Sequence, residues 1–236
     1  MTILPHLSLW NLGRRSYKEA LSIQNSVAAH IKTLISEDKT PSGTVLLVEH
    51  DPVYTVGLRT KQYTERDEEK LKQLGAEFYK TDRGGLITFH GPGQLVVYPI
   101  INLKIFKPSV KWYVSNIENV VIDICRQYGL KAETSPHTGV WVGDKKICAI
   151  GIHGSRYVTT HGFALNCSTE LEWFTHIVPC GIEGKGVTSI SEELGEKITP
   201  GDVLPQLIDC FAKGFNCSLG SLQDYTNVEI LLKSIH

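Results

Sequence analysis

The stretch KICAIGIHGSRYVTTHGFALNC, residues 146–167, decides the fold class of this chain. Lys146–His153 and Arg156–Cys167 are two extended runs, and Gly154-Ser155 separates them. Glycine at the first position of a two-residue loop is typical of a β-hairpin turn. We therefore predict an antiparallel hairpin with its turn at Gly154-Ser155.

Helices and buried strands flank this hairpin in blocks. We predict four helices. The first begins at the capping box Ser16-Tyr17-Lys18-Glu19, and the last begins at Thr199-Pro200-Gly201-Asp202. Between them, one helix lies near Glu65–Leu74 and another runs from about Lys111 to Tyr128, with Gly129 as its stop. Buried strands are predicted at Val45–Val48 and Leu95–Ile101, and a first strand around Leu7 and Leu9. The order predicts an α+β fold, a mixed, largely antiparallel sheet flanked by helices.

Composition limits the function classes. The 236 residues are 42% hydrophobic with a net charge of −1, and we find no internal repeat or linker-like tract, so we expect one domain over residues 1–236. Acidic and basic residues are mixed along the chain, which argues against a nucleic-acid partner. No apolar run reaches the roughly 18 residues that span a bilayer. We therefore expect a protein that does not enter a membrane.

Two stretches carry the features of a ligand site. The first, Arg83-Gly84-Gly85-Leu86-Ile87-Thr88-Phe89-His90, is followed by Gly91-Pro92-Gly93-Gln94, and its glycines let backbone N–H groups approach a ligand. It lacks the Lys-Ser/Thr ending of a phosphate-binding P-loop, and two hairpin turns around a short strand are the alternative. The second, Thr160-His161-Gly162-Phe163-Ala164-Leu165-Asn166, places small residues beside a histidine that is either structural or part of a binding surface.

Cys180 is the best candidate nucleophile among six cysteines. It stands between Pro179 and Gly181, in a rigid turn with little bulk to shield the thiol, whereas Cys125, Cys148 and Cys210 fit buried small hydrophobes. A thiol of ordinary pKa needs a nearby cation or base to become a thiolate. Candidate activators are Lys145 or Lys146, His90 and His161, although a lysine at a strand start is usually a solvated edge residue.

Two other chemistries fit the sequence poorly. His161, Cys167, His176 and Cys180 lack the close pairs of a zinc site, so we expect no metal. A serine hydrolase is also disfavoured, since the chain has no Gly-x-Ser-x-Gly elbow.

Taken in order, these stretches resemble the lipoyl(octanoyl) transferase family. The resemblance spans roughly Gly13 to Asn216 and includes Thr138-Gly139-Val140-Trp141-Val142 and Lys146-Ile147-Cys148-Ala149-Ile150-Gly151. Cys148 and Asn166-Cys167-Ser168-Thr169-Glu170-Leu171 are closer to the animal mitochondrial branch than to bacterial members. The family's fold resembles the catalytic domain of biotin and lipoate protein ligases.

The resemblance implies a function and its residues. A catalytic dyad would be Cys180 and Lys146, and the substrate would lie along Arg83–His90, Ala149, Ile150, Gly151, Gly162, Phe163 and Ala164, with His161 in support. The donor would be octanoyl acyl carrier protein. The acceptors would be lysines on lipoyl domains of 2-oxoacid dehydrogenase subunits and on glycine cleavage H protein, with no ATP or metal required.

Several questions stay open at this stage. The branch implies the mitochondrial matrix, or the cytoplasm for a bacterial protein, but Met1–Lys18 shows no convincing targeting signal. The alternatives are an ATP-dependent lipoate or biotin ligase on the same fold, a non-catalytic protein that binds acyl chains or lipoyl domains, and a thioesterase.

Overall fold

The computed structural model describes residues 4–59, 63–177 and 185–224. Its helices are α1 (Tyr17–Ser36), α2 (Glu65–Gln73), α3 (Val110–Gln127), the 3-10 helix η1 (Leu171–His176), α4 (Ile190–Leu194) and α5 (Pro200–Phe215). Its strands are β1 (His6–Arg15), β2 (Gly43–His50), β3 (Val53–Val56), β4 (Glu77–Lys80), β5 (Ile87–His90), β6 (Gln94–Ile101), β7 (Ala132–Thr134), β8 (Val140–Val142), β9 (Lys145–Ser155), β10 (Val158–Asn166), β11 (Gly186–Val187) and β12 (Ser218–Asp224).

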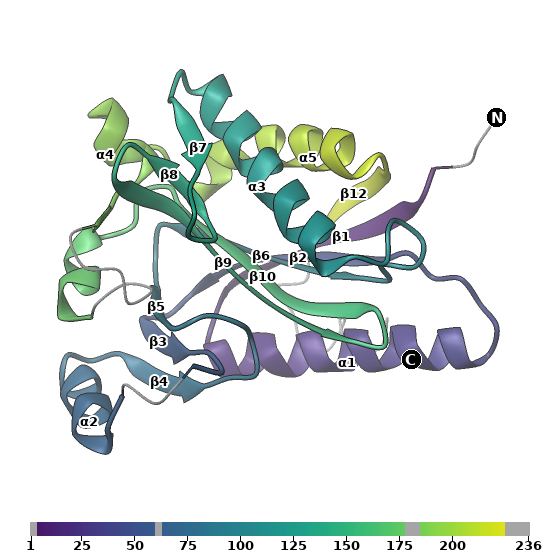
Figure 1. Cartoon of the computed structure of the whole chain (residues 1–236), viewed down its shortest axis with the longest axis horizontal. Helices are drawn as coiled ribbons and strands as arrows, with labels where there is room; N and C mark the ends of the chain where they lie inside the picture. The colour runs from purple at the N-terminus through teal and green to yellow at the C-terminus, as the bar shows by residue number, and fades with distance from the viewer. Residues whose placement is uncertain (1–3, 60–62, 178–184, 225–236) are drawn as a thin grey trace.

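A large mixed sheet forms the centre of the molecule (Figure 1). Its strand order is β12-β1-β2-β6-β10-β9-β8-β7, with β11 paired to β9. The pairs β12–β1, β1–β2 and β11–β9 are parallel, and the others are antiparallel. The predicted α+β class is therefore confirmed.

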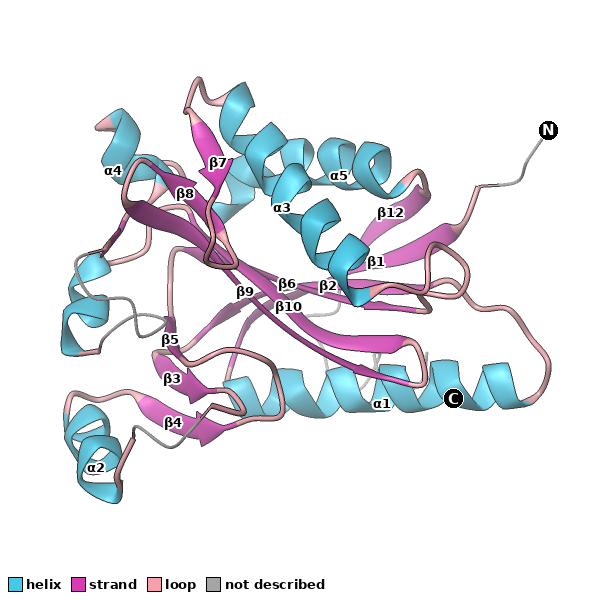
Figure 2. Ribbon diagram, in the orientation of Figure 1, coloured by secondary structure: helices cyan, strands magenta, loops and turns pink. Residues whose placement is uncertain are grey.

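Helices cover both faces of this sheet. Figure 2 shows α3 and α5 on one face and α1 on the other. Beneath α3 and α5 lies the larger core, which includes Ile117, Val121 and Phe211, whereas Ala20 and Val27 of α1 pack on the opposite face. Among the described residues, no helix is long and apolar enough to cross a membrane.

The predicted helix starts are confirmed by their caps. The Ser16 hydroxyl accepts a hydrogen bond from the Glu19 N–H and the Glu19 carboxylate accepts one from the Ser16 N–H, which closes the capping box of α1. Thr199 and Asp202 form the same box at α5. Each box satisfies backbone donors that the first helical turn leaves without partners.

The hairpin is confirmed, but its predicted turn is wrong. Val158 pairs with Ser155 and Thr159 with Gly154, so the two-residue turn is Arg156-Tyr157, and Gly154 belongs to β9. Arg156 and Tyr157 have φ of 53° and 65°, values that both central residues of a type I′ turn require. The sequence signal failed because neither residue is glycine or asparagine. Long-range contacts hold the turn, since the Tyr157 carbonyl accepts from the Leu103 N–H at 2.8 Å.

A smaller sheet, β4-β3-β5, packs beside the large one and presents the first glycine-rich stretch. Its apolar side holds Tyr54, Phe89 and Phe174. The Phe89 ring stacks on Trp173 with centroids 5.0 Å apart, and the Tyr54 hydroxyl donates to the Trp173 carbonyl at 2.7 Å. These contacts fix β5, which carries His90, against η1.

Candidate functional site

One cavity gathers most of the residues singled out from the sequence. It has a volume of about 40 Å³ and lies between β5, β9, β10 and the start of α1. Its lining consists of Tyr17, Arg83, Gly85, Leu86, Ile87, Thr88, His90, Val96, Tyr98, Ala149, Ile150, Gly151, His161, Gly162, Phe163 and Ala164. Three stretches that are far apart in the sequence therefore meet in one place.

Two of the expected substrate residues lie elsewhere. Phe89 points away from the cavity, into the aromatic cluster with Tyr54 and Trp173. Gly84 lines a neighbouring groove. Alternation along β5 explains the position of Phe89, because Thr88 and His90 lie on the other face of the strand.

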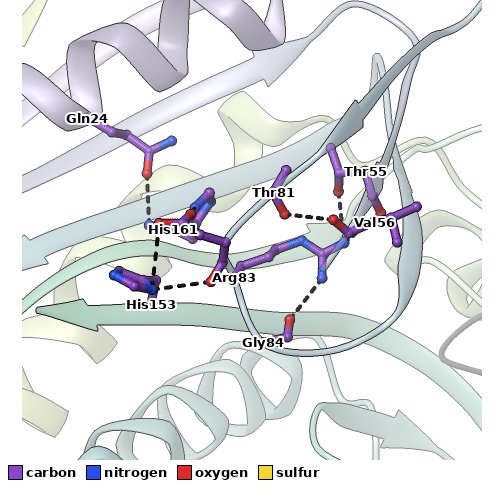
Figure 3. Close-up of polar contacts among 9 residues, drawn as sticks. Gln24, Thr55, Val56, Thr81, Arg83, Gly84, His153 and His161 are labelled. Atoms are coloured by element: carbon purple, nitrogen blue, oxygen red, sulfur yellow. Dashed lines mark hydrogen bonds and ion pairs between the residues drawn. The ribbon is translucent and has the colours of Figure 1, made fainter. Parts of the chain in front are cut away.

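Arg83 builds one wall of the cavity. Its Nη2 donates to the Thr55 carbonyl at 2.7 Å, to the Thr55 hydroxyl at 2.9 Å and to the Leu86 carbonyl at 2.9 Å, while Nη1 donates to the Gly84 carbonyl at 3.0 Å (Figure 3). The guanidinium thus holds the glycine-rich turn in shape. A Cβ on Gly151 would lie 3.0 Å from both Arg83 Cδ and the Gly84 carbonyl oxygen, so β9 needs glycine there to pass this wall.

His90 is buried and neutral. Its Nδ1 lies 2.8 Å from the Gln94 side-chain oxygen and must carry the proton, so its Nε2, 3.3 Å from the Thr55 hydroxyl, accepts. Burial, and then the charges of His50 and Arg83, lower the pKa of His90 well below its usual range. His90 is therefore equipped to orient groups and poorly suited to collect a proton at neutral pH.

A buried hydrogen-bond chain runs from His90 toward Lys146. The Gln94 amide donates to the Asn166 side-chain oxygen at 2.9 Å, and the Asn166 amide donates to the Thr188 carbonyl at 2.9 Å. The Thr188 N–H then donates to the Lys146 carbonyl at 3.0 Å. Buried amides satisfied in this way hold their segments in a single arrangement.

His161 lies in β10 with an unusual backbone. Its φ is 57°, and its N–H donates to the fully buried Gln24 side-chain oxygen at 2.8 Å, which secures this left-handed conformation (Figure 3). Its Nε2 donates to the Asp82 carboxylate at 2.8 Å. Burial lowers the pKa of His161, and Asp82 opposes that effect only in part.

Lys146 stands in a groove beside the cavity. It is 6% exposed, its ammonium donates to the Thr138 carbonyl at 3.1 Å, and it lies 4.7 Å from the centre of the Trp141 ring. A Cβ on Gly139 would be 3.2 Å from Lys146 Cε and 2.7 Å from the Cys148 carbonyl, so only glycine leaves room for this lysine. The groove shares Gly85, Leu86 and Ile150 with the cavity.

Cys180 lies in residues 178–184, outside the described part of the chain. The other five cysteines are buried, as predicted for Cys125, Cys148 and Cys210. Burial raises the pKa of Cys125 to about 12 and that of Cys217 to about 11, and it also raises the pKa of the remaining three thiols. None of these five thiols is therefore prepared to be a thiolate at neutral pH.

Comparison with known proteins identifies the family. The family model of the lipoyl protein ligase A/B catalytic domain matches residues 16–212. The mitochondrial octanoyl-[acyl-carrier-protein]:protein N-octanoyltransferase of Danio rerio is 56% identical over 209 residues, 89% of this chain and 92% of that protein. The chain belongs to the lipoyl(octanoyl) transferase family.

A more distant family member and a solved structure of the same fold add two points. The octanoyltransferase of Rubrobacter xylanophilus is 44% identical over 203 residues, 84% of this chain and 89% of that protein, a lower identity than the animal mitochondrial relative shows. A structure from an archaeal lipoylation system, described as a bipartite lipoate protein ligase and its E2 lipoyl domain from Thermoplasma acidophilum, superposes with a TM-score of 0.71 at 15% identity, and the match covers 98% of this chain and 92% of that one. The predicted kinship with the lipoate ligase fold is confirmed.

The sequence reasoning missed some of the residues that line or support the cavity. Tyr17 and Tyr98 line the cavity, and His50 accepts a hydrogen bond from Tyr98 at 2.7 Å. The Tyr17 ring stacks on His90, with centroids 6.3 Å apart. Only the placement of Tyr17 at the first turn of a helix was visible in the sequence, and that does not indicate a cavity. Within the described residues, no group of three His, Cys, Asp or Glu residues could hold a metal ion.

Proposed function

We propose that this chain, as one catalytic domain, transfers an octanoyl group from octanoyl acyl carrier protein to a lysine of a lipoyl domain. The observation that carries the proposal is the junction of the cavity with the groove. Phe163 and Ala164 give the cavity apolar surface, and Ile150 belongs to both spaces. An acyl chain in the cavity would bring its carbonyl carbon to the junction, on the side of Lys146.

In the first half-reaction Cys180 is the nucleophile. The positive charge of Lys146 favours the thiolate of a nearby cysteine. The thiolate attacks the carbonyl carbon of the donor thioester, the bond to the carrier's sulfur breaks, and the released thiolate takes a proton from Lys146. The backbone N–H of Gly85 is a candidate to hold the oxyanion that forms, whereas the Gly84 N–H donates to the Ile152 carbonyl at 3.0 Å. One thioester replaces another, so this step depends on positioning.

In the second half-reaction the amine of the acceptor lysine attacks the octanoyl thioester on Cys180. Lys146, neutral after the first step, takes a proton from that amine, and the bond to the Cys180 sulfur breaks as the amide forms. An amide is more stable than a thioester, so the transfer proceeds without ATP. The low pKa of His90 supports an orienting role for its imidazole.

The partners and the compartment follow from the same proposal. The name of the Danio rerio relative specifies an acyl carrier protein donor and a mitochondrial location. We place this chain in the mitochondrial matrix, with the lipoyl domains of 2-oxoacid dehydrogenases and glycine cleavage H protein as acceptors. Its site residues require no metal and no ATP for the two steps above.

The test is a pulse-chase experiment in which intact-protein mass spectrometry follows the octanoyl group. The chain is mixed with octanoyl acyl carrier protein and then with an apo lipoyl domain, without ATP. We expect an octanoyl adduct that maps to Cys180, is absent from Cys180→Ser and moves to the acceptor lysine. Modification of the domain only when ATP and magnesium are present would instead establish a ligase, and release of free octanoate a thioesterase. Failure to modify any acceptor under either condition would leave a binding protein.

A further inference from the structure

The groove that holds Lys146 has two apolar walls and a cationic lining. Val110 and Val114 of α3 form one wall, and Leu86 with Ile152 of β9 forms the other. Val110 is 52% exposed, so its apolar side chain is accessible to a ligand in the groove. The groove has a volume of about 400 Å³ and opens to solvent, so it can take an extended ligand.

The charges in this groove have one sign. Arg59 and Lys146 line it, together with the imidazole of His137, and no Asp or Glu does among the described residues. Glu118, on the same helix as Val114, accepts a hydrogen bond from the Gly139 N–H at 3.2 Å and lies outside the lining. A groove of this kind attracts anionic ligands and repels cations.

This asymmetry distinguishes the two substrates of the proposed reaction. The acceptor presents a lysine side chain that is an ammonium ion at neutral pH until it reaches its base. The donor presents a phosphopantetheine arm, a linear chain with two amides and a dimethyl branch, anchored by a phosphodiester. Apolar walls fit the branch, and Arg59 fits the phosphate as a charge-assisted partner.

We infer that this groove binds the phosphopantetheine arm of the octanoyl donor, with its thioester end at Ile150 and Leu86 and its phosphate end toward Arg59. The inference rests on the proposed transferase function and adds a binding site to it. Because Leu86 and Ile150 line both spaces, the acyl chain and the arm lie on opposite sides of one carbonyl group. The acceptor domain then lies outside this groove, and only the amine of its lysine reaches Lys146 at the junction.

Donors of decreasing length test the inference. Octanoyl acyl carrier protein and octanoyl coenzyme A carry the complete arm with phosphate, octanoyl pantetheine lacks the phosphate, and octanoyl N-acetylcysteamine lacks most of the arm. For each donor, kcat/KM is measured with the wild-type chain, with Val114→Trp and with Arg59→Ala, at a fixed concentration of apo lipoyl domain. Asn119→Trp, an exposed position on the same helix outside the groove, is the matched control.

We expect Val114→Trp to lower kcat/KM about tenfold or more for the three donors with a pantetheine arm and less than about twofold for octanoyl N-acetylcysteamine. Arg59→Ala should affect only the two donors that carry the phosphate. The KM for the lipoyl domain should not change, and Asn119→Trp should behave as wild type. Circular dichroism and the melting temperature confirm that the variants are folded.

Two results overturn the inference. Equal losses for all four donors would mean that Val114→Trp disturbs the site without meeting the arm. A raised KM for the lipoyl domain, with unchanged donor kinetics, would assign the groove to the acceptor. The proposed function fails separately, when the wild-type chain transfers octanoate from none of the donors.

Discussion

The cavity and the groove share three residues but differ in the charged groups that line them. In the cavity, the Arg83 guanidinium donates hydrogen bonds to oxygen atoms of Thr55, Gly84 and Leu86, and burial lowers the pKa of His90 and of His161. The groove contains Lys146, whose ammonium donates to the Thr138 carbonyl. In the proposed mechanism the cavity holds the uncharged acyl chain and the groove supplies the group that moves protons.

Removal of the Lys146 amine should have the largest effect on the transfer rate. We expect Lys146→Ala to lower kcat by about 10² to 10⁴-fold, because the variant lacks the proton carrier of both half-reactions. Lys146→Arg keeps the charge without a group that deprotonates, so it should retain alkylation of Cys180 by iodoacetamide and lose the transfer. The neighbouring Lys145→Ala, at an exposed side chain 4.0 Å from Glu193, is the control and should stay within about twofold of wild type. Wild-type kinetics of Lys146→Ala would place the chemistry outside the groove.

Filling the cavity tests the other side of the comparison. Gly151→Val places a branched side chain where a Cβ already meets Arg83 and the Gly84 carbonyl. We expect kcat/KM for octanoyl donors to fall about 10 to 200-fold, with a smaller loss for butanoyl donors, which need less of the cavity. Gly154→Val, in the same strand with no atom within 4 Å of the added Cβ, should leave both donors unaffected. An equal loss for both chain lengths would speak against an acyl site.

The neutral histidines near the cavity should make stability depend on pH. Burial lowers the pKa of His50 from 6.5 to about 4, so between these values the unfolded chain binds a proton that the folded chain does not. The free energy of unfolding should therefore be about 2 kcal/mol lower at pH 5 than at pH 7, because the unfolded chain gains a proton on His50 that the folded chain does not bind. Urea titrations at pH 7 and pH 5 should show the loss, and His50→Gln should reduce it, whereas His30→Gln, on the exposed face of α1, should not. An equal loss of unfolding free energy between pH 7 and pH 5 in wild type and in His50→Gln would contradict the role given to His50.

The smallest effect is expected at the rim of the cavity. Asp82 accepts from His161 but is 60% exposed, so solvent screens the pair. We expect Asp82→Asn, which keeps an accepting oxygen, to change kcat/KM by less than about threefold. Steady-state kinetics from pH 6 to 8 would show whether the His161–Asp82 pair contributes more than this to the rate of transfer. A loss above tenfold with a shifted pH profile would make His161 a participant in proton transfer.

Local signals in the sequence were reliable wherever a segment determines its own structure. The capping boxes at Ser16 and Thr199 predicted two helix starts because both partners of each box lie within four residues. The turn at Arg156-Tyr157 was missed because its support comes from Leu103, more than fifty residues away. The strand pattern also could not predict that β9 and β10 would meet β5 of the smaller sheet.

The candidate site divides in the same way. The stretch at Arg83–His90 was visible because glycine and proline are dense between Arg83 and Gln94, with an arginine, a threonine and a histidine among them. Tyr17, Gln24 and His50 were not visible, since each contributes through a contact with a residue distant in the sequence. Residues that position the cavity-lining side chains through long-range contacts have ordinary local sequence patterns, so they are recognised only once the fold is known.

The pairing of β1 with β12 brings the two ends of the described chain together. His6 lies opposite Ser218, and their side chains are hydrogen-bonded across 212 residues of sequence. This edge of the sheet cannot form during synthesis until residues 218–224 have left the ribosome, and until then β1 exposes an unpaired backbone edge to other nascent chains. A non-local closure of this kind slows folding. Its completion would thus act as a late checkpoint, leaving truncated products with an open strand that chaperones and proteases can recognise.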